Sequence, residues 1–252
     1  MFDKNTTSNT YNEIPKISIV IPAYNEEGFI SSCLDALTKQ TTSGKFEVIV
    51  VNTNSTDNTL KIVNEYIKKL NLVIINEKRK GRSPTRLAGF INALGQIILS
   101  TDADARVPID WVEKIMVAFD KDASVSAITG TCKIIDCFWF KNSVFNFFQP
   151  LLMKIYRLFF GHFWLSGFNF AIRKDAYTKS GGFDPNLNGL EDIDLSFKVS
   201  RAGKIKFLPD LCVTMSGRRF QKGLLKGVTP YLRSFISYYW LKRKDIYFDD
   251  PR

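Results

Sequence analysis

The chain has 252 residues, 45% of them hydrophobic and 24% charged, and its formal net charge is +10. This length suits one large α/β domain, and the composition is that of a folded chain. The positive charge favours anionic partners such as nucleotides, phosphates or anionic lipids. No nucleic-acid recognition motif accompanies it, so we expect no nucleic-acid partner. With one histidine and no CxxC pair, the sequence also lacks the ligands of a zinc site.

The first half of the chain alternates between apolar strands and amphipathic helices. Residues 1–15 are mostly polar, and we expect them to form a flexible N-terminus. Strands are expected at 17–21, 46–51, 72–75 and 96–100, and helices at 26–37, 55–67 and 83–94. The strands are apolar almost throughout, which predicts a Rossmann-like, mostly parallel central sheet with helices on both faces.

The second half is less regular and richer in aromatic residues. Strands are expected at 124–135, 168–172, 204–207 and 211–215, and a helix at 190–201. The segment 138–164 is expected to be broken by Pro150 and Gly161, and one or two helices at 224–244 to be interrupted near Pro230. We therefore expect one α/β domain at 16–220 and a basic amphipathic helical tail at 221–252.

Polar clusters follow the first, second and fourth expected strands, at 23–26, 52–55 and 101–104. Ligands of open α/β sheets bind beyond the carboxyl ends of the strands. The sequence therefore predicts that these three clusters converge on one edge of the sheet.

Asp102 and Asp104 form the cluster after the fourth strand. Mg²⁺ or Mn²⁺ binds through one or two such carboxylates and completes its shell with phosphate oxygens and water. The ion then neutralises charge on a departing diphosphate. The alternative is a turn in which both aspartates cap a helix that starts near Pro108. The position at the end of a buried strand favours the metal site.

Two further segments have the chemistry of a site. The loop from Pro22 to Glu26 leads from a strand into a helix, so it offers backbone N–H groups and a positive helix end to a nucleotide. The alternative is a plain turn capped by Asn25.

Glu191 and Asp192 open a helix after a glycine-rich turn. They either stabilise the helix dipole or supply a general base.

Together these stretches resemble family 2 glycosyltransferases of the GT-A fold, from about Ile17 to Arg219. The landmarks that carry the resemblance are 18–26 (SIVIPAYNE), 54–59 (NSTDNT), 80–86 (KGRSPTR) with Gly89, 101–104 (TDAD), 181–184 (GGFD) and 191–195 (EDIDL). Each is weak alone, but the ordered set is specific.

The resemblance implies an inverting enzyme that uses a nucleotide-sugar donor, UDP- or GDP-linked, and an acceptor that is a glycan or is lipid-linked. Asp192 would be the catalytic base, with Glu191 beside it near the acceptor. Asp104 would ligate the metal directly, and Asp102 would approach both the metal and the ribose. The implied donor site comprises Pro22, Ala23, Tyr24, Glu26, Asn52, Asn54, Arg82, Arg86, Asp102, Ala103, Asp104, Arg218 and Arg219.

Several of these assignments carry an alternative. Arg82 and Arg86 either face the diphosphate or are ordinary surface charges of a helix. Arg218 and Arg219 either clamp the diphosphate or belong to a solvated basic tail. Asn52 stands where the family usually has an aspartate that contacts the base, which leaves the base preference open. The Gln-x-x-Arg-Trp signature of processive synthases is absent, which favours single transfer.

The aromatic segment 138–164 has three interpretations: an acceptor wall, an interfacial membrane element or a homodimer contact. The tail from 218 to 244 carries eight basic residues and no acidic one, which favours an anionic membrane surface. No apolar run reaches the length of a spanning helix. We therefore expect a cytoplasmic protein, either free or peripheral on the inner face of the cell membrane.

Two other functions remain at this point. A nucleotidyltransferase has a related sheet and a metal-bound aspartate, but it normally shows a glycine-rich basic loop after the first strand, where this chain has Pro22-Ala23-Tyr24-Asn25. A degenerate, non-catalytic sugar or lipid binder is the second alternative. Asp102, Asp104 and Asp192 argue against it.

Overall fold

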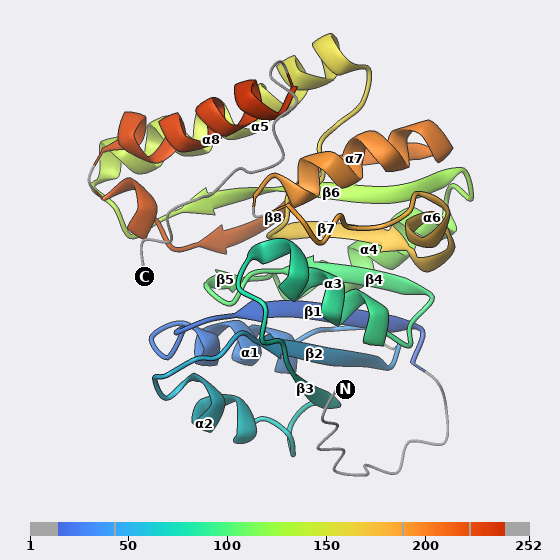
Figure 1. Cartoon of the computed structure of the whole chain (residues 1–252), viewed down its shortest axis with the longest axis vertical. Coiled ribbons are helices and arrows are strands. Elements are labelled where there is room, and N and C mark those ends of the chain that lie inside the picture. The colour runs from blue at the N-terminus through green and yellow to red at the C-terminus, as the bar shows by residue number, and fades with distance from the viewer. Residues whose placement is uncertain (1–14, 43, 188, 222, 240–252) are drawn as a thin grey trace.

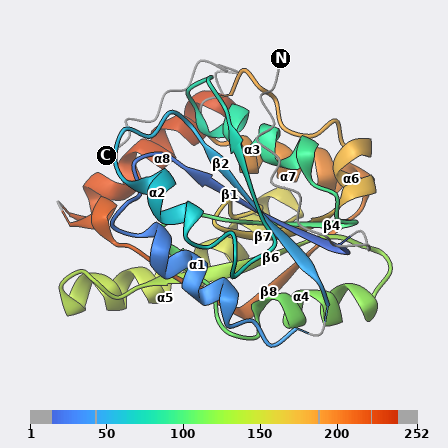
Figure 2. The same cartoon turned by 90° about the horizontal axis from the view of Figure 1, so that it is seen from below.

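A computed structural model describes residues 15–42, 44–187, 189–221 and 223–239. Within these ranges, helices cover both faces of an eight-stranded sheet with the order β3-β2-β1-β4-β7-β6-β8-β5 (Figures 1 and 2). This arrangement confirms the expected α/β architecture. The expected flexible N-terminus, apart from Pro15, and the part of the tail beyond residue 239 lie outside the described residues.

The first half of the chain forms the parallel part of the sheet. Its strands are β1 (Ile17–Ala23), β2 (Phe46–Asn52), β3 (Leu72–Asn76) and β4 (Ile97–Thr101), and its helices are α1 (Ile30–Thr38), α2 (Thr59–Asn64) and α3 (Arg82–Asn92). β1 pairs in parallel with both β2 and β4. The carboxyl ends of these three strands therefore lie at the same edge of the sheet, as the sequence predicted.

Two apolar layers hold the sheet between its helices. Alternate side chains of β1 point to opposite faces, as the pleat of a strand requires. Ile19 and Ile21 join the layer under α1, α2 and α4 (Trp111–Asp120). Val20 joins the layer under α3, α6 (Lys174–Lys179) and α7 (Glu191–Ala202). Burial on both faces explains why these strands are apolar almost throughout.

The second half completes the sheet with β5 (Ala105–Arg106), β6 (Val125–Ile134), β7 (Asn169–Arg173) and β8 (Lys204–Met215). β7 is antiparallel to both neighbours, β4 and β6. The two strands expected at 204–207 and 211–215 form one strand, β8, whose pairing with β6 shifts register between Thr129 and Thr131. The separation into two strands was therefore wrong, because the irregularity at Leu208-Pro209-Asp210 is absorbed as a bulge.

Two long helices lie together beyond the β6 side of the sheet (Figure 1). They are α5 (Trp139–Phe160) and α8 (Leu224–Tyr239), and the 3-10 turn η1 (Arg218–Phe220) precedes α8. The ring centroids of Phe160 in α5 and Tyr239 in α8 lie 5.2 Å apart, and those of Phe145 in α5 and Phe220 in η1 lie 4.8 Å apart.

The expected breaks at Pro150 and Pro230 are wrong, because α5 and α8 run through them. A proline in a helix removes one backbone hydrogen bond and crowds the preceding turn. In α5 this cost is offset by an inward stripe at helical spacing, in which Gln149, Met153 and Tyr156 are buried. The expected break at Gly161 is confirmed: the residue caps α5 in a left-handed conformation, with φ at 77°.

Among the described residues, no helix combines the length and the apolar character that crossing a lipid bilayer requires.

Candidate active site

The loops after β1 and β2 are joined by hydrogen bonds between side chains and backbone. Asn25 N donates to Ser55 Oγ over 3.1 Å, and Thr56 N donates to Asn25 Oδ1 over 2.9 Å. Glu26 N donates to Thr59 Oγ1 over 2.7 Å. The predicted nucleotide loop is therefore fixed by the neighbouring loop, which leaves its shape preformed.

Three non-glycine residues of the described chain have positive φ angles, and all three border the same edge. They are Asn25 at 50°, Asn54 at 53° and Leu190 at 59°. Asparagine tolerates this left-handed conformation, but leucine does so at a cost. Leu190 directly precedes Glu191, so the strained residue sets the direction in which α7 begins. Strain of this kind concentrates at functional sites.

Arg86 lies at the centre of the site. Its side chain extends from α3 and is only 4% exposed, and each guanidinium nitrogen donates to a protein acceptor. Nη2 donates to Asp102 Oδ1 over 2.8 Å, Nε to Glu191 Oε1 over 3.1 Å and Nη1 to Ser100 Oγ over 3.1 Å. Burial works to lower the pKa of Arg86, but Asp102 and Glu191 outweigh it and hold the pKa above its usual range. The alternative of a surface charge is therefore wrong for Arg86.

Asp192 lies beside this arginine, at the start of α7. Its Oδ2 accepts a hydrogen bond from Gly167 N over 2.8 Å, and its Oδ1 accepts one from Ile193 N over 2.9 Å. Burial, reinforced by the negative charge of Glu191, raises the pKa of Asp192 to about 6 despite the opposing charge of Arg86. A carboxylate with a pKa in this range is suited to accept a proton near neutral pH.

Gly167 allows this close approach between the arginine and the carboxylate. A Cβ atom at this position would lie 2.6 Å from Arg86 Nη2 and 3.1 Å from Asp192 Oδ2. The carbonyl oxygen of Gly167 also accepts a hydrogen bond from Ser100 Oγ over 2.9 Å. A side chain here would separate the groups that the glycine brings together.

Arg218 connects the β1 loop to the cluster after β4. It is bidentate to Glu26, with Nη1 3.0 Å from Oε2 and Nη2 2.7 Å from Oε1. The same Nη2 lies 2.9 Å from Asp104 Oδ2, and the guanidinium lies over the ring of Phe29 at 4.8 Å. The alternative of a solvated basic tail is therefore wrong for Arg218.

The remaining predicted donor residues have varied surroundings. Asn52 donates from Nδ2 to Asn76 Oδ1 over 2.9 Å and accepts at Oδ1 from Ser55 N over 3.2 Å. Asn54 donates to Lys78 O over 3.2 Å. Pro22 and Tyr24 are half-buried, whereas Ala23 and Ala103 are buried in the core under α1. These two alanines present only backbone groups at the edge.

Arg82 and Arg219 lie nearer α8. The guanidinium of Arg219 stacks over the ring of Tyr231 at 5.0 Å. Burial acts to lower the pKa of Arg82, but Tyr231, Glu191 and Asp102 raise it above its ordinary value. Both arginines thus border the side of the site where α8 approaches.

The chemistry of the donor set fits a hard divalent cation. Asp102 and Asp104 bring two carboxylates to the end of β4, and no cluster of three potential metal-binding side chains occurs in the part of the chain that the structure describes. A site of this kind suits Mg²⁺ or Mn²⁺, which take the rest of their ligands from water and substrate phosphates. Each carboxylate also contacts an arginine, Arg86 or Arg218.

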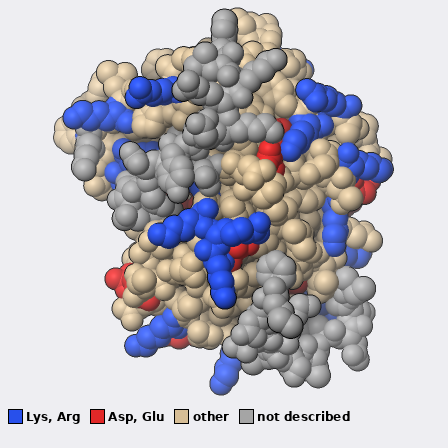
Figure 3. Space-filling view, in the orientation of Figure 1, with Lys and Arg blue, Asp and Glu red and all other residues tan. Residues whose placement is uncertain are grey.

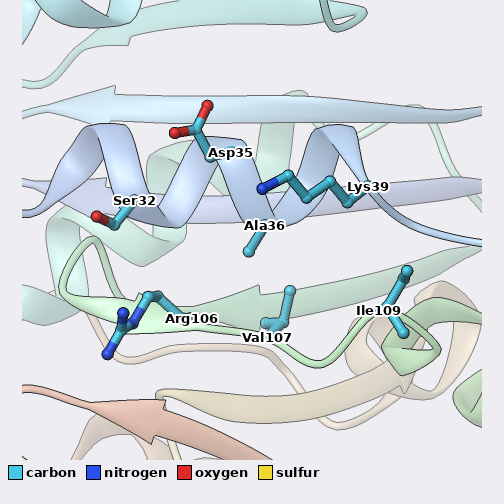
Figure 4. Close-up of a pocket in the computed structure, with 7 residues that line it drawn as sticks. All are labelled: Ser32, Asp35, Ala36, Lys39, Arg106, Val107 and Ile109. Carbon is cyan, nitrogen blue, oxygen red and sulfur yellow. The ribbon is translucent and has the colours of Figure 1, made fainter.

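An open hollow elsewhere on the surface is separate from these residues. It lies between α1 and the segment 106–109 and is lined by Ser32, Asp35, Ala36, Lys39, Arg106, Val107 and Ile109 (Figure 4). None of the predicted site residues lines it.

Ser100 and Gly167 contribute to the site but were not predicted from sequence. Ser100 is the first polar residue of β4 after three apolar ones and lies two positions before Asp102, which is a signal that could have identified it. Gly167 stands directly ahead of a buried strand, where a glycine often marks a close backbone approach.

Residues 18–181, more than half of the chain, match the family model described as glycosyl transferase family 2. The chain belongs to glycosyl transferase family 2. The probable glycosyltransferase YdaM of Bacillus subtilis is 30% identical over 263 residues, which cover 94% of this chain and 61% of that protein. The hyaluronan synthase of Pasteurella multocida is 29% identical over 204 residues, covering 80% of this chain and 20% of the synthase. This family 2 chain therefore spans about three fifths or less of the length of these relatives.

Solved structures of glycosyltransferases share the fold. The S. aureus TarS fragment 1-349 in complex with UDP-GlcNAc superposes with a TM-score of 0.64 at 24% identity, covering 80% of this chain and 58% of that one. The mannosyltransferase PcManGT from Pyrobaculum calidifontis, in complex with GDP-Man and Mn²⁺, has a TM-score of 0.64 at 22% identity, covering 88% and 65%. These likenesses confirm the expected GT-A fold.

Proposed function

We propose that this family 2 glycosyltransferase domain transfers a sugar from a nucleoside-diphosphate sugar to an acceptor in a single, inverting displacement. The observation that carries the proposal is the carboxylate of Asp192. Two backbone N–H groups orient it, its pKa is about 6, and it lies beside the arginine that holds Asp102. This combination supports a general base next to a diphosphate site.

In the proposed reaction the acceptor hydroxyl loses its proton to Asp192 as its oxygen attacks the anomeric carbon. The bond between that carbon and the diphosphate oxygen breaks, and the nucleoside diphosphate leaves from the opposite side. Attack and departure on opposite faces invert the anomeric centre. Glu191 pairs with Arg86 and raises the pKa of Asp192, so it acts as a positioning residue. An acceptor that is already an ionised phosphate would need no base.

Asp102 and Asp104 are the residues that would hold Mg²⁺ or Mn²⁺. When bound, the ion would neutralise charge on the leaving diphosphate. Arg218 would then have to share or release Asp104 Oδ2, and its guanidinium is suited to bind phosphate. Arg82 lies on the same side and is the second candidate for the diphosphate. Arg86 instead orients Asp102, because its three nitrogens bond to the protein.

The donor would be UDP- or GDP-linked, as in the complexes of TarS and PcManGT. Its nucleotide would contact the segment 22–26 and the loop at 52–54. The amide of Asn52 is held by Asn76 and Ser55, which favours base recognition by backbone groups and by Tyr24.

We propose a reducing, cytoplasmic setting, because the four cysteines have free thiols and two of them are buried.

The acceptor classes are a glycan hydroxyl and a lipid-linked acceptor. α8 contributes to the proposed site, because its Tyr231 lies under the guanidinium of Arg219 and raises the pKa of Arg82.

A thermal-shift screen of UDP- and GDP-sugars with Mg²⁺ and with Mn²⁺ tests the proposal. A donor that binds the folded state raises the melting temperature by mass action. We expect a shift that requires both sugar nucleotide and metal, and that Asp104→Asn removes. A nucleotidyltransferase would instead respond to nucleoside triphosphates and release pyrophosphate. If no sugar nucleotide stabilises the protein with either metal, the proposed function fails.

A further inference from the structure

α5 has an apolar stripe on the side that faces away from the protein. Phe147, Leu151, Ile155 and Leu158 recur every three or four residues and are exposed, Leu158 by 83%, and Phe159 beside them is exposed by 76%. The buried residues of the helix, Gln149, Met153 and Tyr156, lie on the opposite side. The core under α5 therefore does not account for these exposed apolar side chains, and large contiguous exposed patches mark interaction sites.

α8 repeats this arrangement beside α5. Leu225, Val228, Leu232 and Ile236 recur every three or four residues and are exposed, Leu225 by 83%. Gly227 and Ser234 lie on the buried side of the helix. Ring contacts of Phe160 with Phe235 and Tyr239 join the C-terminal ends of α5 and α8, and Phe145 of α5 contacts Phe220 of η1, so the two outward stripes belong to one end of the molecule (Figure 1).

The charges on these two helices all have one sign. Lys141, Lys154 and Arg157 are on α5, and Lys226 and Arg233 are on α8. The sequence has no acidic residue between Asp136 and Asp175 or between Asp210 and Asp245. Figure 3 shows basic side chains in excess of acidic ones on one face of the molecule. Apolar stripes flanked only by basic side chains are complementary to an anionic lipid surface.

We propose that the outward stripes of α5 and α8 form one surface that binds the face of an anionic lipid bilayer. The two helices would lie in the plane of the headgroups, with their aromatic and leucine side chains inserted and their lysines and arginines at the phosphates. A second copy of this chain fits the surface less well, because pairing two such surfaces would bring the five positive charges of one copy against the five of the other.

The surface is attached to the helix that begins with the candidate base. Tyr238 of α8 donates a hydrogen bond to Asp194 of α7, and Phe160 of α5 lies with its ring centroid 5.7 Å from that of Phe197. Docking α5 and α8 on a bilayer would therefore hold the start of α7 near the lipid headgroups. A lipid-linked acceptor is the substrate class that this placement favours, a consequence that rests on the proposed function.

Cosedimentation of the full chain with large vesicles tests the lipid surface without any substrate. We expect binding to vesicles of phosphatidylcholine with phosphatidylglycerol and little binding to phosphatidylcholine alone. The double variant Leu158→Glu/Phe159→Glu should lower binding at least about tenfold, because both apolar contacts are replaced by charges that the bilayer repels. Reversing Lys154 to Glu should weaken binding roughly fivefold or more, since each basic residue near an anionic surface contributes on the order of 1 kcal/mol.

The matched control is Ile91→Glu/Leu94→Glu, which changes two exposed apolar residues, one in the last turn of α3 and one just after it. It should bind vesicles like the unaltered chain, and circular dichroism should show every variant to be folded. Equal vesicle binding by the α5 double variant and the unaltered chain would overturn the proposal. So would an unaltered chain that ignores both vesicle types, or that forms a dimer that the α5 variant abolishes.

Discussion

Arg218 Nη2 lies 2.9 Å from Asp104 Oδ2 and 2.7 Å from Glu26 Oε1, so one guanidinium neutralises carboxylates from two loops. A divalent cation at Asp104 would compete with this arginine for the same carboxylate. The position that the sequence assigns to a metal thus already contacts a positive charge, and this has a measurable consequence.

We predict that Arg218→Gln strengthens Mn²⁺ binding to the nucleotide-free protein roughly tenfold, the equivalent of about 1.4 kcal/mol, because the competing cation is removed. The same variant should weaken binding of a nucleoside diphosphate in the presence of Mn²⁺, because a phosphate contact is lost. Isothermal titration calorimetry measures both affinities. Arg219→Gln is the matched control, since that guanidinium stacks on Tyr231. Equal effects of the two variants on Mn²⁺ binding would rule out competition at Asp104.

Asp192→Asn should reduce the rate of sugar transfer to an acceptor hydroxyl by about 10² to 10⁴, the usual contribution of a general base. Donor affinity should be nearly unchanged, because the proposed donor contacts lie on other residues. Turnover assays and donor titrations separate the two effects. A variant that keeps full turnover would remove Asp192 from the role of base.

The pH dependence of transfer should follow the ionisation of Asp192. A base acts in its ionised form, so activity should rise as the pH increases through about 6. Glu191→Gln keeps an acceptor for Arg86 but removes a negative charge that raises this pKa, so the rising limb should move to lower pH. Profiles of kcat/KM against pH provide the measurement, and an unmoved limb in the variant would contradict the assignment.

The same pKa also affects stability. Folding raises the pKa of Asp192 above its unfolded value of about 3.9, so the folded chain binds this proton more tightly. The resulting contribution to stability is fully present below about pH 3.9 and is lost as the pH rises through about 6.

Arg86→Met should lower the free energy of unfolding by about 3 to 5 kcal/mol, because it leaves the carboxylate of Glu191 buried without its cation. Urea denaturation followed by circular dichroism measures this loss. Arg79→Met is the control: its pair with Glu77 involves an arginine side chain that is 52% exposed, so the loss should stay below about 1 kcal/mol. Similar losses in the two variants would mean that the buried Arg86 pair stabilises the fold no more than the exposed Arg79 pair.

The parallel half of the fold was predictable, because its strands are apolar, its helices have one apolar face, and the two alternate. The direction of β7 was not, because pairing with β4 depends on the path of residues 102–168 and leaves no periodic signal in 169–173. The helix breaks predicted at Pro150 and Pro230 were wrong for a related reason. Their local cost is visible in the sequence, whereas the packing of α5 and α8 that offsets it is not.

The candidate site follows the same division. Asp102, Asp104, Glu191 and Asp192 were predicted as site residues because carboxylates that directly follow a strand or open a helix suggest metal or base chemistry. The pair of Arg86 with Glu191 joins residues 105 positions apart, and the pair of Arg218 with Glu26 joins residues 192 positions apart. Only the fold brings such distant residues together, so neither ion pair could be predicted from sequence spacing.

The pairing of Glu26 with Arg218 also bears on how the protein is made. The ribosome adds Arg218 192 residues after Glu26, when β1 to β8 have already been synthesised. Contacts between such distant parts of a chain form late, because a long loop must close first. The carboxylate of Glu26 would therefore meet its arginine only after η1 has been made, and a nascent chain cut short before η1 would have the sheet without this ion pair.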